Sequence, residues 1–395
     1  MSEIRVTNVL GENGNSPVNF TKGINMSGIV TATSFVPTVG QLSHRNIIIN
    51  GACNIAQRGV SATSVSGQYK TVDRFSVNYS GEDEDPTEAQ HTLSTSDTPY
   101  TLGFRKSFHI TNGNQTSGAG AADYVQPQYK IEAQDIANSG WNYTDSNSFI
   151  TLSFWVKASV AGDYTLNMNT HDGTPYRYLM EYSLLANTWK HVVFKIPGNS
   201  NLTVNNDNGL GLQIMWYPFL GSNYIQADQE NNWYASSNQK YGTTSTTNWW
   251  TTNDATWEIT GVQLEVGSVA TPFEHRSFGD ELSRCQRYFH IIKTGSGEDR
   301  YIGQLQVYGS GSCHGKYFHF PVTMRATPTT TLSGTITPTN ASGNFSSNFS
   351  SATFDRNTTE FVGSNNTSGS SGLTAGNTAA IGLRQNSSIS SSAEL

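Results

Sequence analysis

The chain has 395 residues, a formal net charge of −7 and a charged fraction of only 13%. The negative charge and the lack of a basic run disfavour a nucleic-acid partner, since phosphate binding needs clustered Lys and Arg. No apolar stretch approaches the roughly 20 residues of a membrane-spanning helix, so no membrane insertion is expected. Hydrophobic residues make up 35% and aromatic residues 11%, and the high aromatic share argues against disorder.

Residues 1–45 are predicted to form an extended, strand-rich leader. They mix glycine with short β-branched runs and cannot bury a core of their own, so we expect them to become ordered by pairing with sister chains. The alternative is a flexible tail. The first residues, MSEIRVTNVLGENG, have no apolar signal-peptide core.

Residues 46–275 carry repeated signals of β-strands. Apolar residues alternate with others over 150–156, 192–196 and 210–216, which places one side of each strand on a core. Turns rich in Gly, Asn and Asp separate the runs, and this pattern predicts a sandwich or barrel. In TWEITGVQLEVG the apolar residues occupy odd positions up to Ile259 and even positions from Val262. This change at Thr260-Gly261 predicts a β-bulge there.

Residues 276–293 are predicted to form a helical connector. Ser277 precedes Asp280 and Glu281, which is typical of an N-cap with acids in the first turn. The apolar residues at helical spacing are Phe278, Leu282, Cys285, Phe289 and Ile292.

Residues 294–395 are predicted to form a second β unit. Residues 317–324 alternate as in a strand, and phenylalanines recur through the Ser-, Thr-, Asn- and Gly-rich tract that follows. A segment of pure low complexity would lack these phenylalanines, so we expect thin strands joined by long turns.

No motif of a catalytic or cofactor site is present. There is no GxSxG, HExxH or phosphate loop, the nine histidines lack metal-site spacing, and the three cysteines form no CxxC. We therefore expect no enzyme activity, cofactor or metal. A glycan depolymerase would need two carboxylates across a glycosidic bond, and Asp and Glu are plentiful enough to leave that possibility open.

Acidic residues at 82–85 suggest a calcium site or, in the interpretation we prefer, a solvated loop. The run GluAspGluAsp lacks the order and the glycine of an EF-hand loop. Asp73 and Glu265 are a weaker alternative for a structural calcium ion, suggested only by the resemblance to known modules described below.

The segment 221–257 is the most suggestive for binding. It places large aromatic residues among Asn, Gln and Ser, and sugars offer both apolar C–H faces and hydroxyls to such a set. The alternative is that the aromatics fix a long loop or bury a subunit interface. The candidate glycan-binding residues are Trp233, Tyr234, Tyr241, Trp249 and Trp250.

Three sequence blocks carry a resemblance to a known family. They are RNIIINGACNIAQRG with TVDRFSV, ITLSFWVKAS with NTWKHVVFKIPG, and ITGVQLEVGSVATPFEHRSFGDELSRCQRYF. Together they resemble a module of tail-fibre and other virion proteins of tailed bacteriophages. The leader segment GINMSGIVTATSF resembles the start of marine and cyanobacterial phage fibres, and KYFHFPVTMRATPT resembles the small β domain that often follows the module.

The resemblance implies a fold and a set of partners. It implies a jelly-roll similar to carbohydrate-binding modules at 46–275, so the expected fold is all-β: leader, jelly-roll β-sandwich, short helix and second small β-sandwich. It also implies a homotrimer in the phage particle, assembled in the bacterial cytoplasm, with the leader attaching it to other virion proteins. Residues carried over with structural roles are Asp73, Arg74, Trp155, Trp189, Gln263, Glu265 and Arg287.

The function expected from these observations is that of a structural fibre or appendage protein that binds host-surface polysaccharide during adsorption. One alternative is a purely architectural capsid, neck or adaptor component. Another is a glycan depolymerase.

Overall fold

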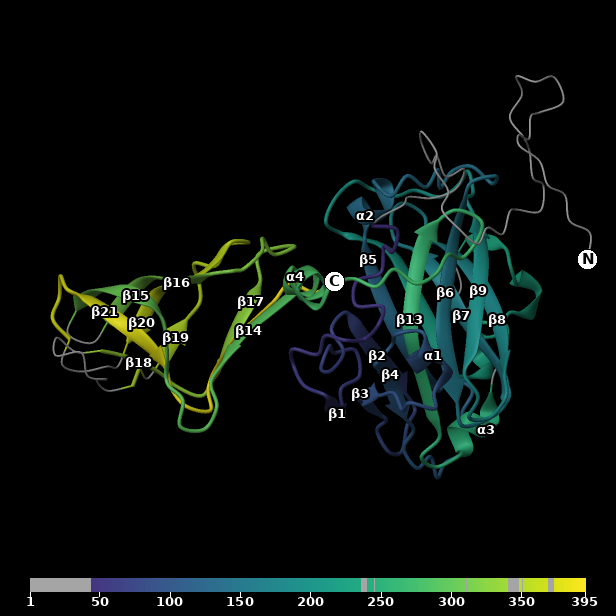
Figure 1. The fold of residues 1–395 in the computed structure, drawn as a ribbon, viewed down its shortest axis with the longest axis horizontal. Helices are drawn as coiled ribbons and strands as arrows, with labels where there is room; N and C mark the ends of the chain where they lie inside the picture. The colour runs from purple at the N-terminus through teal and green to yellow at the C-terminus, as the bar shows by residue number, and fades with distance from the viewer. Residues whose placement is uncertain are drawn as a thin grey trace, which may run out of the picture. The chain divides into compact units, whose positions relative to one another are not determined.

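The computed structural model describes residues 44–235, 240–244, 246–309, 312–339, 348–349, 351–368 and 373–395. The leader predicted at 1–45 therefore lies outside the described residues, apart from its last two positions. The described chain is all-β, as predicted, with antiparallel sheets and only short helices (Figure 1). Within that part, no helix is long and apolar enough to span a membrane.

The first half of the described chain forms two facing antiparallel sheets, here called the β6 sheet and the β7 sheet after a central strand of each. The β6 sheet runs in the order β1 (Ser61–Thr63), β3 (Thr87–Thr92), β4 (Lys106–Thr111), β13 (Thr256–Val266), β6 (Phe149–Ala158) and β9 (Lys190–Pro197). The β7 sheet runs β11 (Phe219–Leu220), β5 (Tyr124–Glu132), β10 (Leu210–Tyr217), β7 (Gly162–Thr170), β8 (Tyr176–Leu184) and β12 (Trp233–Ala235), and β2 (Phe75–Ser80) also pairs with β5.

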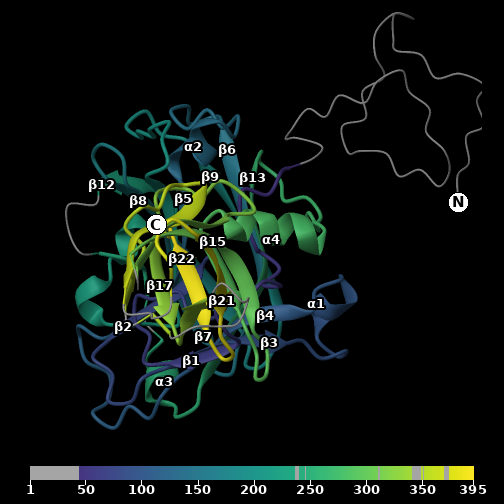
Figure 2. The ribbon, with the colours of Figure 1, turned by 90° about the vertical axis from the view of Figure 1, so that its left-hand side faces the viewer.

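Short helical segments connect some of the strands of this sandwich. In the views of Figure 1 and Figure 2, α2 and α3 lie at opposite ends of it. The helical segments are α1 (Thr98–Thr101), α2 (Ala133–Ala137), η1 (Ser222–Tyr224), η2 (Ala227–Gln229) and α3 (Thr247–Thr251).

One hydrophobic core fills the space between the two sheets. The alternating apolar residues predicted in β6 all have no exposed surface, and Leu212, Ile214 and Trp216 of β10 meet them from the other sheet. The predicted bulge is confirmed, because the β13–β6 register shifts between Thr260 and Gln263. Gly261 has φ +63°, and a Cβ there would lie 2.7 Å from the Phe104 ring, so this position favours glycine.

The connector helix is shorter than predicted. Helix α4 spans Phe278–Gln286, and Ser277 Oγ accepts from the Asp280 N–H at 3.2 Å, which confirms the N-cap. The expected continuation to residue 293 is wrong, because Phe289–Lys293 forms strand β14 and pairs with β22 (Ser388–Ser392). That pairing joins segments almost a hundred residues apart, so local periodicity cannot reveal it.

The C-terminal part has its own two sheets and its own core. Leu305, Val362 and Ile381 are central in a hydrophobic cluster separate from that of the first sandwich. One sheet contains β14, β22 and β17 (Thr329–Ser333) in that order. The other contains β18 (Ile336–Pro338), β21 (Thr378–Leu383), β15 (Arg300–Gly309), β16 (Ser312–His319), β20 (Phe361–Ser368) and β19 (Ser351–Thr353).

Residues 393–395 pack against the first sandwich. Arg74 is buried with its guanidinium 3.5 Å from the Tyr288 ring centre, and it forms an ion pair with Glu394. Arg58 reaches the same carboxylate at 3.1 Å, and Lys130 Nζ donates to the Leu395 carbonyl at 2.8 Å. Arg74 is thus buried and paired with an acidic side chain.

Candidate functional site

A polar and aromatic pocket of about 400 Å³ lies on the outer face of the β7 sheet. Its floor consists of residues from β5, β10, β7 and β8 whose side chains alternate with those of the core. Its rim comes from the chain between β11 and β13, the segment that the sequence singled out for binding. We call it the tyrosine pocket.

Four tyrosines form one wall of the tyrosine pocket. Tyr124 and Tyr217 come from β5 and β10, whereas Tyr224 and Tyr241 come from the segment that covers the sheet. The ring centres of Tyr224 and Tyr241 are 5.5 Å apart, those of Tyr124 and Tyr224 are 5.9 Å apart, and those of Tyr217 and Tyr241 are 6.4 Å apart. All but Tyr217 are partly exposed, so aromatic surface remains open to a ligand.

The covering segment is held close to the sheet by hydrogen bonds and by one glycine. The Tyr241 N–H donates to the Tyr224 carbonyl at 2.8 Å, and Asn167 Nδ2 donates to the Tyr241 carbonyl at 2.6 Å. A Cβ on Gly242 would lie 2.3 Å from Cγ2 of Thr165, closer than any side chain allows. The position of the Tyr241 ring therefore depends on the absence of a side chain at residue 242.

Amide and imidazole groups also line the tyrosine pocket. His171 Nε2 lies 2.9 Å from Gln213 Oε1, and Gln213 Nε2 donates to Gln128 at 2.5 Å. Burial lowers the pKa of His171 below its usual 6.5, so the ring is neutral at pH 7. These side chains offer hydrogen-bond donors and acceptors, and none of the described lining residues is acidic.

Asn169 and Arg177 stand directly opposite each other on the adjacent strands β7 and β8. Both are buried, at 6% and 4% exposure, and both line the pocket. Asn169 Oδ1 and Arg177 Nε each lack a hydrogen-bond partner among the described residues. A hydroxyl group can accept from one of these atoms and donate to the other, which is what a polyhydroxylated ligand supplies.

The Arg177 guanidinium has no carboxylate within 4.0 Å among the described residues. It lies 4.2 Å from the Tyr241 ring centre and donates to the Lys240 carbonyl. None of the described lining residues is Asp or Glu, so the pocket carries no candidate carboxylate pair.

The structure corrects the expectation for the three tryptophans. Trp249 and Trp250 have no exposed surface and Trp233 is 6% exposed, so none presents a ring face to a sugar. Each indole N–H donates to a backbone carbonyl: Trp233 to Pro197 at 2.7 Å, Trp249 to Thr256 at 3.1 Å, and Trp250 to Gly118 at 2.7 Å. These rings fix the segment to the sandwich, because a large apolar ring with one polar N–H is most stable when both are satisfied inside.

The two predicted tyrosines have different positions. Tyr241 lines the tyrosine pocket. Tyr234, in β12, is half-buried and donates its hydroxyl to the Lys240 carbonyl at 2.7 Å, the carbonyl that Arg177 also contacts. Tyr234 is not among the lining residues, and it binds the residue that precedes Tyr241.

Sequence reasoning missed the residues on the sheet floor: Tyr124, Asn169, His171, Arg177, Gln213 and Tyr217. One signal was available, since Gln213 and Tyr217 alternate with the core residues of β10 and must point outward. The missing information was which strands lie beside β10, because only adjacency brings these side chains into one pocket.

The acidic residues at 82–85 hold a neighbouring loop. Asp83 accepts from the Ser117 N–H at 2.6 Å and from its hydroxyl at 2.7 Å, and these bonds lower the pKa of Asp83. Glu84 accepts from the Asn114 N–H at 2.7 Å. Asp83 and Glu84 thus have protein donors, whereas Glu82 Oε2 has none among the described residues.

Asp73 and Glu265, the weaker alternative for a calcium site, also accept hydrogen bonds from protein groups. Asp73 accepts from the Gln57 N–H at 3.0 Å and lies 3.7 Å from Arg58. Glu265 accepts from the Thr271 N–H at 2.8 Å and from its hydroxyl at 2.7 Å.

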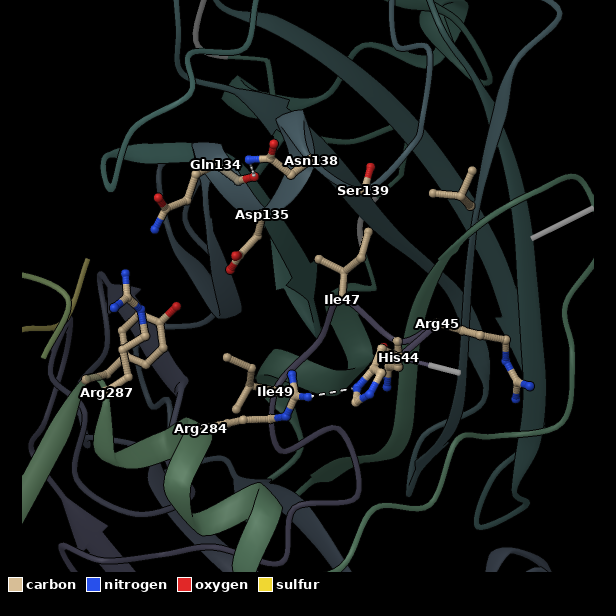
Figure 3. Close-up of a pocket in the computed structure, with 13 residues that line it drawn as sticks. His44, Arg45, Ile47, Ile49, Gln134, Asp135, Asn138, Ser139, Arg284 and Arg287 are labelled. Atoms are coloured by element: carbon tan, nitrogen blue, oxygen red, sulfur yellow. Dashed lines mark hydrogen bonds between the residues drawn. The ribbon is translucent and has the colours of Figure 1, made fainter. Parts of the chain in front are cut away.

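A second hollow, of about 420 Å³, lies beside α2, α4 and residues 44–49 (Figure 3). Its arginines have protein partners: Arg284 contacts His44 at 3.1 Å, and Arg287 binds Glu132 through two nitrogens at 2.9 and 2.8 Å. The residues before His44 lie outside the described chain, so we place the candidate site in the tyrosine pocket.

No protein-family model and no curated protein matches the sequence. Among solved structures, the chain is similar to the enzymatically active domain of tailspike protein 4 of bacteriophage CBA120, with a TM-score of 0.30 and 11% identity, over 56% of this chain and 21% of that one. It is similar to a family 11 carbohydrate-binding module from Clostridium thermocellum (TM-score 0.25, 10% identity, 54% and 98% covered). It is also similar to a cyclase from Fischerella sp. (TM-score 0.30, 7% identity, 59% and 98% covered). The chain thus spans about a fifth of the tailspike chain.

Proposed function

We propose that this protein is a non-enzymatic fibre or appendage component of a tailed-phage virion, and that its jelly-roll unit binds a host-surface glycan in the tyrosine pocket. The observation that carries the binding proposal is the pair of polar atoms without a partner among the described residues, Asn169 Oδ1 and Arg177 Nε, in a pocket lined by four tyrosines. A buried polar atom without a partner costs roughly 1–3 kcal/mol, and a ligand that satisfies it recovers that cost.

A glycan can contact both the tyrosines and the polar side chains that line the pocket. A pyranose ring has apolar C–H faces that pack on aromatic rings, and its hydroxyls donate and accept around the edge. The partly exposed rings of Tyr124, Tyr224 and Tyr241 provide the first kind of contact. Asn169, Arg177 and the other amide and imidazole groups provide the second kind.

The lining also favours binding over hydrolysis. Glycoside hydrolases need an acid and a second carboxylate on either side of the scissile bond, and the described lining has neither. Binding without cleavage suits an attachment protein, which must hold a surface polysaccharide rather than release it.

The virion part of the proposal is supported by the three sequence blocks and the leader that resemble tailed-phage fibre proteins. The homotrimer and the attachment through residues 1–45 belong to the same proposal. Antibody-labelled electron microscopy of intact particles and light scattering of the purified chain test them. Label at the head or neck, together with no glycan binding, would favour the architectural alternative.

The binding proposal is tested with an array of bacterial surface oligosaccharides, followed by calorimetry on each hit. Tyr224→Ala should weaken binding several-fold, since one aromatic contact is worth about 0.5–1.5 kcal/mol beyond its buried area. Tyr301→Ala is the matched control, because Tyr301 is 60% exposed on the C-terminal unit. Equal affinity of Tyr224→Ala and the unsubstituted protein would contradict the site, and binding of no oligosaccharide would contradict the function.

A further inference from the structure

Two histidines and a glutamate converge on the outer face of the β6 sheet, on the other sheet of the sandwich from the tyrosine pocket. His91 lies in β3, His109 in β4 and Glu258 in β13, which are neighbouring strands. His109 and Glu258 are direct partners in the β4–β13 ladder, and His91 is two residues beyond the partner of His109 in β3. The antiparallel register therefore fixes the three side chains as neighbours.

The three groups are close enough to share one ion. His91 Nδ1 is 3.1 Å and His109 Nδ1 is 3.5 Å from Glu258 Oε2, and one ligand atom from each residue lies within 4.8 Å of the other two. An ion bound at about 2.0–2.2 Å from each ligand needs a separation of this order between them. Only small side-chain rotations separate this arrangement from a coordinated one.

His109 provides an independent observation that points to a ligand. Its Nδ1 is buried and has no hydrogen-bond partner among the described residues. An imidazole nitrogen that lies 3.5 Å from a carboxylate oxygen, without hydrogen-bond geometry to any described residue, is suited to coordinate a cation with its lone pair. The His91 side chain is 49% exposed, so the cluster is open to solvent on that side.

The surrounding groups orient the glutamate and set the charge. Lys157 Nζ lies 2.6 Å from Glu258 Oε1, and Ser107 Oγ donates to Oε2 at 2.8 Å. Asp97 lies 3.3 Å from the same ammonium and offsets it. The carboxylates of Glu258 and Asp97 and the ammonium of Lys157 together leave a local charge of −1, which accommodates a dication.

We propose that His91, His109 and Glu258 form a binding site for a divalent transition metal of the zinc class, with water as the fourth ligand. Two imidazoles and one carboxylate suit Zn²⁺, Co²⁺ or Ni²⁺, whereas Ca²⁺ takes six to eight oxygen ligands. Because the ligands come from three strands, the ion links β3, β4 and β13 and stabilises that part of the β6 sheet. The site goes beyond the proposed glycan binding and does not depend on it.

The test is titration of the untagged, chelator-treated full chain with ZnCl₂ by calorimetry, and with CoCl₂ by visible absorption. We expect one equivalent to bind, a cobalt spectrum typical of low coordination number, and a melting temperature raised by several degrees at saturating zinc. His91→Gln should weaken binding about 10-fold or more, since it removes a ligand at an exposed position that does not disturb the core. His319→Gln, at an exposed histidine of β16, is the matched control and should change nothing.

Three outcomes would overturn the proposal. They are the absence of a one-to-one complex, a zinc affinity that His91→Gln leaves unchanged, and an equal loss in His319→Gln. A His109→Gln variant gives a second, independent measurement, because its loss of binding must match that of His91→Gln if both rings hold the same ion.

Discussion

Asn169 and Arg177 are paired across β7 and β8, yet they do not satisfy each other: the amide oxygen of one and the Nε of the other both remain without a partner among the described residues. Both side chains are more than nine-tenths buried. A hairpin that places a buried donor and acceptor side by side and leaves both open loses stability in the free protein. We interpret that loss as preparation for a ligand.

Arg177→Gln should weaken glycan binding by about 10-fold to 100-fold, because a hydrogen bond to a charged group contributes roughly 1.5–3 kcal/mol. The guanidinium has no described carboxylate partner, so we also expect uronic acid-containing oligosaccharides to bind more tightly than their neutral counterparts. Calorimetry on matched acidic and neutral oligosaccharides measures both effects. An acidic preference that persists in Arg177→Gln would show that another group selects the charge.

Gly242→Ala should displace the Tyr241 ring and weaken binding while lowering stability by about 1–3 kcal/mol, the usual cost of overpacking. The added methyl group would collide with Thr165 and would lie 2.8 Å from Leu220. Gly279→Ala is the control, because a Cβ there meets nothing within 4 Å. Thermal denaturation measures the loss of stability of both variants, and calorimetry measures their glycan affinity. Full affinity in Gly242→Ala would show that the position of Tyr241 does not depend on the contact of Gly242 with Thr165.

Trp250→Ala should destabilise the fold by roughly 3–5 kcal/mol, as large-to-small changes of buried aromatics do. The ring is fully buried, its centre lies 4.8 Å from that of Phe219, and its N–H binds the Gly118 carbonyl. At temperatures where the variant remains folded, glycan affinity should be unchanged. A loss of affinity without a loss of stability would restore Trp250 to the binding site.

Glu88 should make stability depend on pH near neutrality. Burial raises its pKa from the usual 4.5 to about 7, and Thr71 Oγ1 donates to the carboxyl at 3.0 Å. The folded protein then holds a proton that the unfolded chain releases between pH 4.5 and 7, so the contribution of Glu88 falls as pH rises through that window. The shift corresponds to roughly 3 kcal/mol.

Glu88→Gln should remove this contribution, because the amide cannot ionise. The informative quantity is the difference in unfolding free energy between the two proteins, measured by denaturant titration from pH 5 to 8, since Asp73 also titrates with a pKa raised to about 6. A difference that stays constant with pH would contradict the assignment.

The sequence predicted local features well. The parity switch at Thr260-Gly261 and the cap at Ser277 each depend on a few adjacent residues, and the structure confirms both. The end of α4 was mispredicted, since the spacing of Phe289 and Ile292 fits a helix while their strand partner lies in β22. The decisive interaction there is distant in sequence.

The site was only partly predictable for the same reason. The aromatic segment was recognised, and Tyr241 reaches the pocket. Its tryptophans were misassigned because composition cannot distinguish a ring that faces solvent from one that faces the core. The polar lining residues come from β7, β8 and β10. Neither Asn169 nor Arg177 indicates a pocket in the sequence, because only the strand pairing places them side by side.

The contact of Arg74 with Glu394 has a mechanical consequence. A tensile load on residues 289–392 would reach the first sandwich through the backbone at α4, through the buried ion pair and the Lys130–Leu395 bond, and through the bonds between Arg325 and Asn208. A single peptide linker would act as a swivel, whereas several anchorage points resist torsion. Weakening one of them, as in Glu394→Ala, would therefore make the coupling more compliant before either sandwich unfolds.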